Sequence, residues 1–359
     1  MNKILKFFTL DSLIIPIVAV IFGLIVGALI MLLGGYDPIV AYSSLLTSVF
    51  GSSYDFGETI REITPLIMTG LAVGFAARAG LFNIGAEGQY IVGMTAASFI
   101  GIKVTGLPTL IHAPLAIIVG GICGGLWAGI AGYLKAKRGV NEVIVCIMLN
   151  WTALYLGNYM VNNFMLLKGQ QRSMDIQPTA SISMDWLSVM FSDARMHLGT
   201  GLAVLAAVFF YVYMWKSKQG YELRAVGQNP NAAEYAGMNV SRNIVKAMFV
   251  SGVFAGLGGA FQVLGVFHYQ TIMSGSPGVG FDGIAVSLIG MSHPFGILLG
   301  AGLFGTLTYG SDGMSFGAGV PPELIRIVIG SIIFFIAAQG IVRLVLKPIY
   351  LKRKKEKVL

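Results

Sequence analysis

Long apolar runs are the feature that most constrains how this chain can fold. They recur from Ile14 to Val345, and several reach the roughly 20 residues that a helix needs to cross a bilayer. Only 11% of the residues are charged, whereas a soluble domain carries about 25%. The sequence therefore predicts an all-α polytopic membrane protein. About ten spans are expected, at residues 13–34, 62–78, 85–102, 113–134, 142–161, 198–216, 244–266, 281–292, 295–311 and 323–346.

The basic residues set the expected orientation. With a cytoplasmic N-terminus, ten crossings return the C-terminus and its basic tail, residues 347–359, to the cytoplasm. Most of the 24 Lys and Arg residues then lie inside, as the positive-inside rule requires. This clustering accounts for the net charge of +8 without nucleic acid as a partner. The six that fall outside are Arg61, Lys103, Lys168, Arg172, Arg195 and Arg326.

Two glycine-rich segments interrupt the apolar pattern in a similar way. GLFNIGAEGQYIVGM (80–94) opens span three, and GSPGVGFDGIAVSLIGM (275–291) opens span eight. They lie five spans apart, so the two segments run in opposite directions through the membrane. This predicts an inverted repeat of spans 2–5 and 7–10. Broken helices free backbone polar groups, which membranes tolerate only inside protein or beside a cavity, so we expect the substrate path here.

Eight residues at or near these segments are candidates for that path. Glu87 and Asp282 are ionisable groups within spans, where charge is costly and often functional. The alternative is that each caps a broken helix, because acidic groups favour helix N-termini. The amides could hydrogen-bond a polar solute, and the aromatic rings could stack on one or simply pack. The candidates are Phe82, Asn83, Glu87, Gln89, Asn150, Trp151, Phe281 and Asp282.

A short polar stretch, YELRAVGQNPNAAEYAGMNV (221–240), separates two apolar runs on the cytoplasmic side. Asn229 is a favourable N-cap, Pro230 suits the first helical position, and Gly237 can take the left-handed conformation that ends a helix. The helix is too short to be stable alone. Its surface is expected to carry small residues, which suits docking in a groove of another protein. A capped linker helix is the alternative. The small residues are Ala232, Ala233, Ala236 and Gly237.

The motif GxNPxAAxxAGM, as it stands in residues 227–238, resembles the coupling loop of membrane permeases of ABC importers. ARAGLFNIGAEGQ (77–89), NEVIVCIMLNW (141–151) and GVGFDGIAVSLIG (278–290) are similar to the group that transports branched-chain amino acids, simple sugars and nucleosides. Within it, the chain looks most like nucleoside permeases that work with a basic-membrane-protein-type binding lipoprotein. The resemblance covers residues 60 to 345 and implies one permease domain, residues 1–359.

The resemblance also implies partners and roles. The partners are an ATP-binding subunit, a second permease expected to be a paralogue, an extracytoplasmic substrate-binding lipoprotein and a nucleoside substrate. The chain would be a multi-pass protein of the bacterial cell membrane. Its coupling loop, residues 217–243, would fit a cleft of the ATPase. The coupling residues are Glu222, Arg224, Gly227, Asn229, Pro230, Ala232, Ala233 and Gly237. Glu222 and Arg224 are expected to pair with the ATPase or with each other.

The sequence contains no G-x-x-x-x-G-K-[ST] motif and no H-E-x-x-H motif. We therefore expect no cofactor or metal in this chain, and we expect ATP and Mg in the partner ATPase. Permeases for simple sugars or branched-chain amino acids remain alternatives. An ion-coupled secondary transporter also fits inverted repeats and broken helices, but it has no need for the 217–243 loop. A membrane enzyme would need a nucleophile or metal constellation, which the sequence does not offer.

Overall fold

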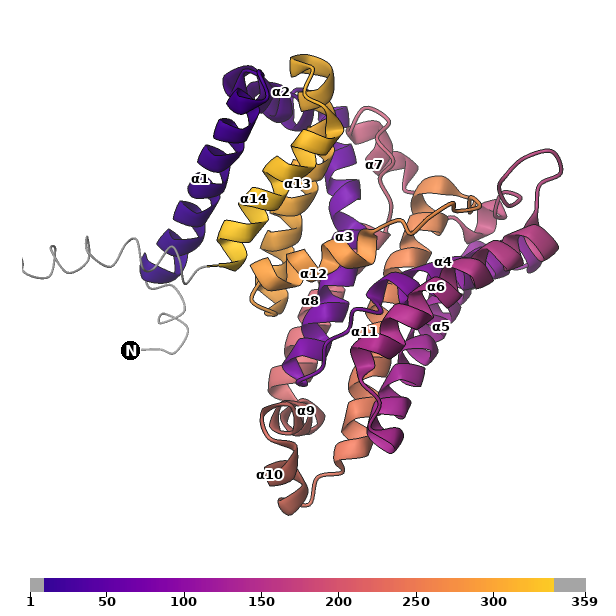
Figure 1. Ribbon diagram of the computed structural model, residues 1–359. Coiled ribbons are helices and arrows are strands. Elements are labelled where there is room, and N and C mark those ends of the chain that lie inside the picture. Colours follow the sequence, from indigo (N-terminus) through magenta and orange to yellow (C-terminus); the bar gives the residue numbers. More distant parts are fainter. Residues whose placement is uncertain (1–9, 339–359) are drawn as a thin grey trace, which may run out of the picture. The chain divides into compact units, whose positions relative to one another are not determined.

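The computed structural model describes residues 10–338, and its regular elements are helices (Figure 1). The chain divides into two compact units, residues 1–51 with 307–359 and residues 52–306. The first unit contains α1 (Leu10–Leu33), α2 (Pro38–Phe50) and α14 (Pro322–Ala337). Helix α13 (Pro294–Ala318) starts in the second unit and ends in the first. The basic tail predicted at 347–359 lies outside the described residues.

In the first unit, α1 and α14 pack side by side (Figure 1). Gly27 faces the Val328 side chain closely enough that a Cβ atom there would lie 2.7 Å from Val328 Cγ1. Helix α2 begins where Asp37 Oδ1 accepts a hydrogen bond of 2.8 Å from the Ile39 amide. An aspartate cap followed by a proline at the first helical position explains where α2 starts.

The second unit holds the remaining helices around a glycine-rich core. Helices α4, α5 and α11 pack on one another, with Gly93 against Gly256 and Gly124 against Gly252. Backbones approach this closely only where side chains are absent, which is the usual way in which membrane helices associate. The helices are α3 (Ser53–Arg78), α4 (Ala86–Lys103), α5 (Thr109–Arg138), α6 (Glu142–Met160), α7 (Asp185–Met190), α8 (Gly199–Lys216), α9 (Lys218–Gln228), α10 (Pro230–Tyr235), α11 (Val240–Gln262) and α12 (Val279–Ile289).

The prediction of an all-α polytopic membrane protein is confirmed for the described residues. Five helices are long and apolar enough to cross a bilayer: α3, α5, α6 extended to Met165, α8 and α11 extended to Phe267. Each expected span overlaps a helix. Helix α12 has only 11 residues, so it rises about 16 Å and cannot by itself cross a hydrocarbon core of about 30 Å.

Helix α3 begins at Ser53, well before the expected start of span two near residue 62. The sequence placed Arg61 in an outer loop, but it lies within α3 and is buried. Arg61 Nε donates to Glu58 Oε2 at 2.7 Å, and Arg195 Nη2 donates to the same oxygen at 2.7 Å. Pairing with Glu58 lets the Arg61 charge lie inside the protein, whereas Arg195 is exposed, and a hydropathy pattern cannot register such pairing.

Candidate transport and coupling sites

The two glycine-rich interruptions meet in the structure. Residues 79–85 connect α3 to α4, and the second interruption leads into α12. Gly280 lies so close to the backbone of Glu87 that a Cβ atom on this glycine would overlap the Glu87 nitrogen. The N-terminal ends of α4 and α12 are therefore in direct contact. This proximity supports one site built from both segments, although the substrate path itself stays a prediction.

Glu87 fixes the start of α12. Its carboxylate is fully buried in the first turn of α4. Oε1 accepts from Ser276 Oγ at 2.5 Å and from the Gly278 amide at 2.6 Å, while Oε2 accepts from the Gly280 amide at 2.5 Å. A negative charge at this position also complements the dipole of α12. These contacts support the capping alternative for Glu87.

Arg78 holds the opposite end of α12. Its Nε donates to the Ser292 carbonyl at 2.8 Å, and its Nη2 donates to the Met291 carbonyl at 2.7 Å. A positive charge near the last carbonyl groups complements the helix dipole at this end. Helix α12 is thus bound at one end by a carboxylate from α4 and at the other by a guanidinium from α3. Sequence reasoning did not assign this role to Arg78, because its partners lie more than 200 residues away.

The predicted amide residues bind the α3–α4 connection to its surroundings. Asn83 and Gln89 exchange two side-chain hydrogen bonds of 2.8 Å, and Asn83 Nδ2 also donates to Ser251 Oγ at 2.6 Å. Asn150 Oδ1 accepts from the Gly88 amide at 2.9 Å, and its Nδ2 donates to the Ile84 carbonyl at 3.0 Å. All three amides are buried, so they act as internal supports in this conformation.

The remaining predicted pathway residues have exposed surface. Phe82 is 41% exposed, Trp151 is 53% exposed and Phe281 is 42% exposed. Asp282 lies in the first turn of α12 and is partly exposed. Trp151 already stacks with Tyr155 at a centroid distance of 6.4 Å. The structure therefore separates the eight candidates into a buried polar support and a partly exposed set that could contact a solute.

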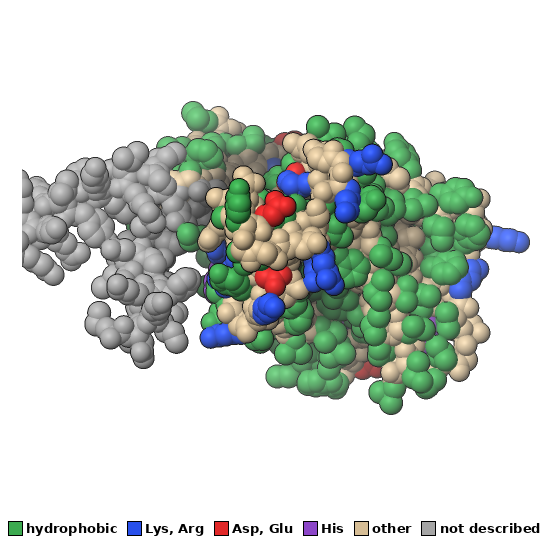
Figure 2. All heavy atoms as spheres, turned by 90° about the horizontal axis from the view of Figure 1, so that it is seen from below, with side chains coloured by type: hydrophobic (Ala, Val, Ile, Leu, Met, Phe, Trp, Pro, Cys, Tyr) green, Lys and Arg blue, Asp and Glu red, His purple; other side chains and the backbone are tan. Residues whose placement is uncertain are grey.

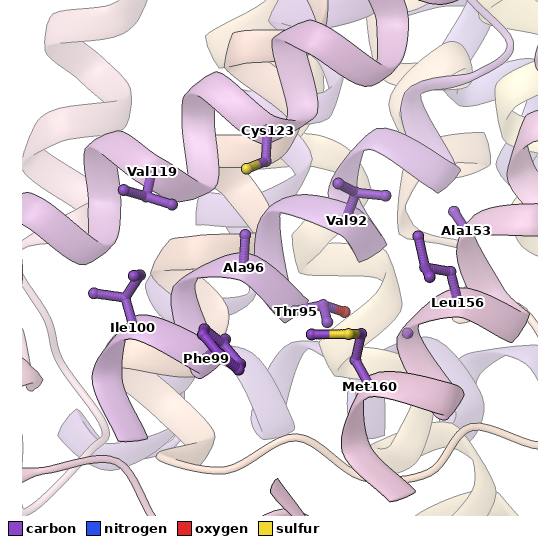
Figure 3. A pocket seen from close by; sticks show the side chains of 11 residues that line it. Val92, Thr95, Ala96, Phe99, Ile100, Val119, Cys123, Ala153, Leu156 and Met160 are labelled. Carbon is purple, nitrogen blue, oxygen red and sulfur yellow. The ribbon is translucent and has the colours of Figure 1, made fainter. Parts of the chain in front are cut away.

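A cavity of about 290 Å³ lies between α4, α5 and α6 (Figure 3). Thr95 and Cys123 are the two lining residues with a polar or thiol side chain, and the other lining residues are apolar. Thr95 Oγ1 donates to the Ile91 carbonyl at 2.9 Å and accepts from Gln270 Nε2 at 2.9 Å. Polar solutes need several convergent polar groups, which this lining does not supply. None of the predicted pathway residues contributes to the cavity, so we do not assign it to the path.

The predicted polar helix forms almost as the sequence indicates. Helix α10 begins at Pro230, and Asn229 Oδ1 accepts from the Ala232 amide at 3.0 Å. Gly237 has φ = +80°, and the Met238 amide donates to the Ala233 carbonyl at 3.0 Å. The predicted N-cap and left-handed stop are confirmed. These local signals worked because both ends of the helix are fixed by residues next to it.

One predicted surface residue of α10 is buried instead. Ala233 is only 3% exposed, whereas Ala232, Ala236 and Gly237 are exposed. The prediction that Ala233 lies on the surface is wrong, because α10 needs one face against α9 and α11 to remain folded. Tyr235 points outward and is 96% exposed. Helix α10 thus presents Tyr235 and small residues on one side and anchors itself with Ala233 on the other.

Helix α9 connects α10 to the membrane helices. Glu222 Oε2 accepts from Asn243 Nδ2 at 3.4 Å, and Arg224 lies over the Trp215 ring with Cζ 6.0 Å from its centroid. The sequence left open whether Glu222 and Arg224 pair with each other, and the structure gives each a different neighbour. Figure 2 views the face that carries α9 and α10, where basic and acidic side chains gather. Exposed basic residues also lie on both sides of the α9–α10 segment in sequence, at Lys216 and Lys218 before or at its start and at Arg242 after it.

Gly227 lies at a contact that the sequence did not reveal. A Cβ atom built on Gly227 would be 2.5 Å from the Ala79 carbonyl carbon and 2.7 Å from the Gly80 nitrogen. The end of α9 therefore lies directly on the start of the α3–α4 connection. Only the pairing of two distant glycines creates this contact, so no local motif could have indicated it.

Residues 56–337 match the profile of the family described as the permease component of branched-chain amino acid transport systems. The chain belongs to this permease family. It is therefore a multi-pass membrane protein and a transport subunit, not an enzyme, as predicted. No solved structure matches the chain.

Three relatives match this permease over most of their lengths. The guanosine ABC transporter permease protein NupP of Bacillus subtilis is 48% identical, covering 94% of this chain and 96% of the relative. The nucleoside ABC transporter permease protein NupB of Lactococcus lactis subsp. cremoris is 36% identical, covering 92% of each chain. The glucose ABC transporter permease protein TsgB13 of Haloferax volcanii is 32% identical, covering 89% of this chain and 86% of the relative.

Proposed function

We propose that this permease is the membrane subunit of an ATP-driven importer of nucleosides. Its similarity to permeases named for guanosine and for nucleosides extends over nearly the whole chain. The observation that carries the mechanism is α10, a capped helix that exposes Tyr235 and small residues while Ala233 anchors it. Such a surface fits a groove on a second protein. The partner would be an ATP-binding subunit that holds ATP and Mg and drives the transport cycle.

The proposed assembly also contains a second permease, a paralogue of this chain, and an extracytoplasmic binding lipoprotein that delivers the substrate. We place α10 and both termini in the cytoplasm and retain ten crossings with an inverted repeat of spans 2–5 and 7–10. The direct contact between the starts of α4 and α12 supports this repeat, because it brings matching interruptions together. The residues that precede α12 would complete the eighth crossing.

In this proposal, the partly exposed residues near the two broken helices contact the substrate. Phe82, Trp151 and Phe281 offer aromatic faces on which a nucleobase could stack, and Asp282 offers a hydrogen-bond acceptor for base or ribose groups. The buried amides and Glu87 would support this surface without touching the substrate. This division follows from the burial of Asn83, Gln89, Asn150 and Glu87, whose polar atoms form hydrogen bonds inside the protein.

A substrate panel tests the function. The complete complex, reconstituted in proteoliposomes with its binding protein, should import guanosine and other nucleosides when ATP is supplied on the α10 side. Glucose, ribose and leucine are tested separately as alternative substrates. Glucose is included because one relative is named for it. Uptake of a sugar or of leucine, but of no nucleoside, would overturn the substrate assignment. Uptake that persists without the ATP-binding subunit and follows an ion gradient would overturn the ATP-driven mechanism.

A further inference from the structure

The contact between Gly227 and Gly80 is formed by two backbones without any intervening side chain. A Cβ atom on Gly80 would lie 2.7 Å from both the Cα and the carbonyl oxygen of Gly227, and a Cβ atom on Gly227 would be equally crowded. We call this the Gly80–Gly227 contact. Close-packed atoms transmit displacement because they cannot be compressed, whereas a flexible side chain could rearrange. A movement of α9 toward α3 therefore has to move residues 79–80.

On the cytoplasmic side, the Gly80–Gly227 contact is joined rigidly to α10. Gly227 is in the last turn of α9, and the Asn229 amide donates to the Ala225 carbonyl at 3.0 Å just before α10 begins. Helix α9 is itself held by its side chains. Gln219 Nε2 donates to Asn243 Oδ1 at 2.6 Å, and Lys246 Nζ donates to Gln219 Oε1 at 2.6 Å. A force applied to α10 consequently reaches Gly227 through a short, well-bonded segment.

On the other side, hydrogen bonds join the Gly80–Gly227 contact to α12. Three residues after Gly80, the Asn83 side chain binds Gln89 and Ser251. Four residues beyond Asn83, the Glu87 carboxylate holds the amides of Gly278 and Gly280. Residues 80–87 thus lead along the chain from the contact to the start of α12, and Asn83 and Glu87, which hold this segment, are buried.

We propose that the Gly80–Gly227 contact is the point at which movement of α10 is transmitted to α12, and that Gly80 and Gly227 position this connection. The inference rests on the proposed function, because it assumes that an ATP-binding subunit moves α10. It adds a specific path: the movement passes through residues 79–87 and ends at the start of α12, beside Phe281. The glycines act through other groups and do not touch the substrate.

Gly227→Ala is the test variant, with Gly201→Ala as its matched control. Gly227 and Gly201 both lie within helices, where alanine is the more favourable residue. A Cβ atom on Gly201 meets nothing within 4 Å, whereas one on Gly227 overlaps Ala79. In complexes that assemble normally, Gly227→Ala should lower ATP-driven uptake by about tenfold or more, in the range of ordinary coupling energies. It should also raise the ATP hydrolysed per nucleoside imported. Gly201→Ala should remain within about twofold of the unmodified protein.

A cysteine probe at Phe281 reports whether α12 responds. Phe281→Cys is placed in a Cys123→Ala background, and its labelling rate is measured in complexes with and without trapped nucleotide. In this background, trapped nucleotide should change the labelling rate of the cysteine. When Gly227→Ala is added, the labelling rate should be the same with and without nucleotide. If nucleotide still changes the rate in the Gly227→Ala complex, or uptake stays coupled there, the proposed path is wrong.

If the Gly227→Ala complex does not assemble, amide hydrogen exchange is measured on the unmodified complex instead. Trapped nucleotide should alter exchange in peptides covering residues 79–87 and 276–282 together. A change at 276–282 without one at 79–87 would show that movement reaches α12 by another route. If the unmodified complex imports no nucleoside in response to ATP, the proposed function fails. Coupled import with an unaffected Gly227→Ala complex would reject the path alone.

Discussion

The α3–α4 connection and the α9–α10 segment are both short, glycine-containing interruptions, yet they use their polar residues in opposite ways. In the first, Asn83 and, just after it in the first turn of α4, Glu87 are buried and bind groups more than 150 residues away in sequence. In the second, Asn229 is exposed and caps only its own helix, and Glu234 is exposed. Buried pairing gives a fixed support, whereas an exposed, locally capped helix is free to engage a partner. Matched substitutions in the two segments should therefore have unequal effects.

The largest effect is expected from Glu87→Ala. Two backbone amides and the Ser276 hydroxyl would lose a charged acceptor inside the protein. Hydrogen bonds to charged groups contribute roughly 1.5–3 kcal/mol each, so we expect a loss of more than about 3 kcal/mol in unfolding free energy. Thermal unfolding of the purified complex measures this loss. The matched control is Glu234→Ala on exposed α10, and an equal effect of the two changes would contradict the contrast.

A smaller effect is expected from Asn83→Ala. The change would leave Gln89 and Ser251 without their partner in a buried region, at a cost of about 2 kcal/mol. Asn229→Ala removes only a helix cap, which costs about 1 kcal/mol and acts locally on α10. Asn83→Ala should therefore lower the unfolding temperature of the complex more than Asn229→Ala does. The reverse order would show that the α3–α4 connection is not the more strongly supported segment.

Tyr235→Ala should have the smallest effect on stability, within about 0.5 kcal/mol, because the side chain is exposed. It should nevertheless weaken binding of the ATP-binding subunit, since tyrosine is a frequent contributor to interface energy. Affinity of the detergent-solubilised permease for the isolated ATP-binding subunit measures this effect. Unchanged affinity would mean that Tyr235 does not belong to the docking surface.

The sequence predicted features whose causes are local. Asn229 and Gly237 lie at the ends of α10, where each acts within a few residues of itself. The apolar runs likewise predicted the membrane helices, because bilayer thickness sets their length. The arrangement of α12 could not be predicted from the sequence. Its ends depend on Glu87 and Arg78 from other helices, and no periodicity records such distant pairs.

The same limit explains two other differences. Arg61 was placed in a loop because a hydropathy pattern scores its charge without regard to any partner. In the structure, Arg61 pairs with Glu58, which lies three residues before it in α3, and both are buried. Ala233 looked like part of a docking face because α10 is too short for a pattern to show which side is anchored. Gly227 was predicted as a coupling residue through resemblance, but its contact with Gly80 required coordinates.

Site-specific photo-cross-linking at position 235 measures whether α10 docks on the ATP-binding subunit. A photoreactive amino acid replaces Tyr235, which is exposed at the end of α10, and the complete complex is irradiated in native membranes. We expect a cross-linked product with the ATP-binding subunit, and the yield of this product should change when ATP is bound. Cross-linking to the extracytoplasmic binding protein instead, or no product with the ATP-binding subunit in an intact complex, would contradict it.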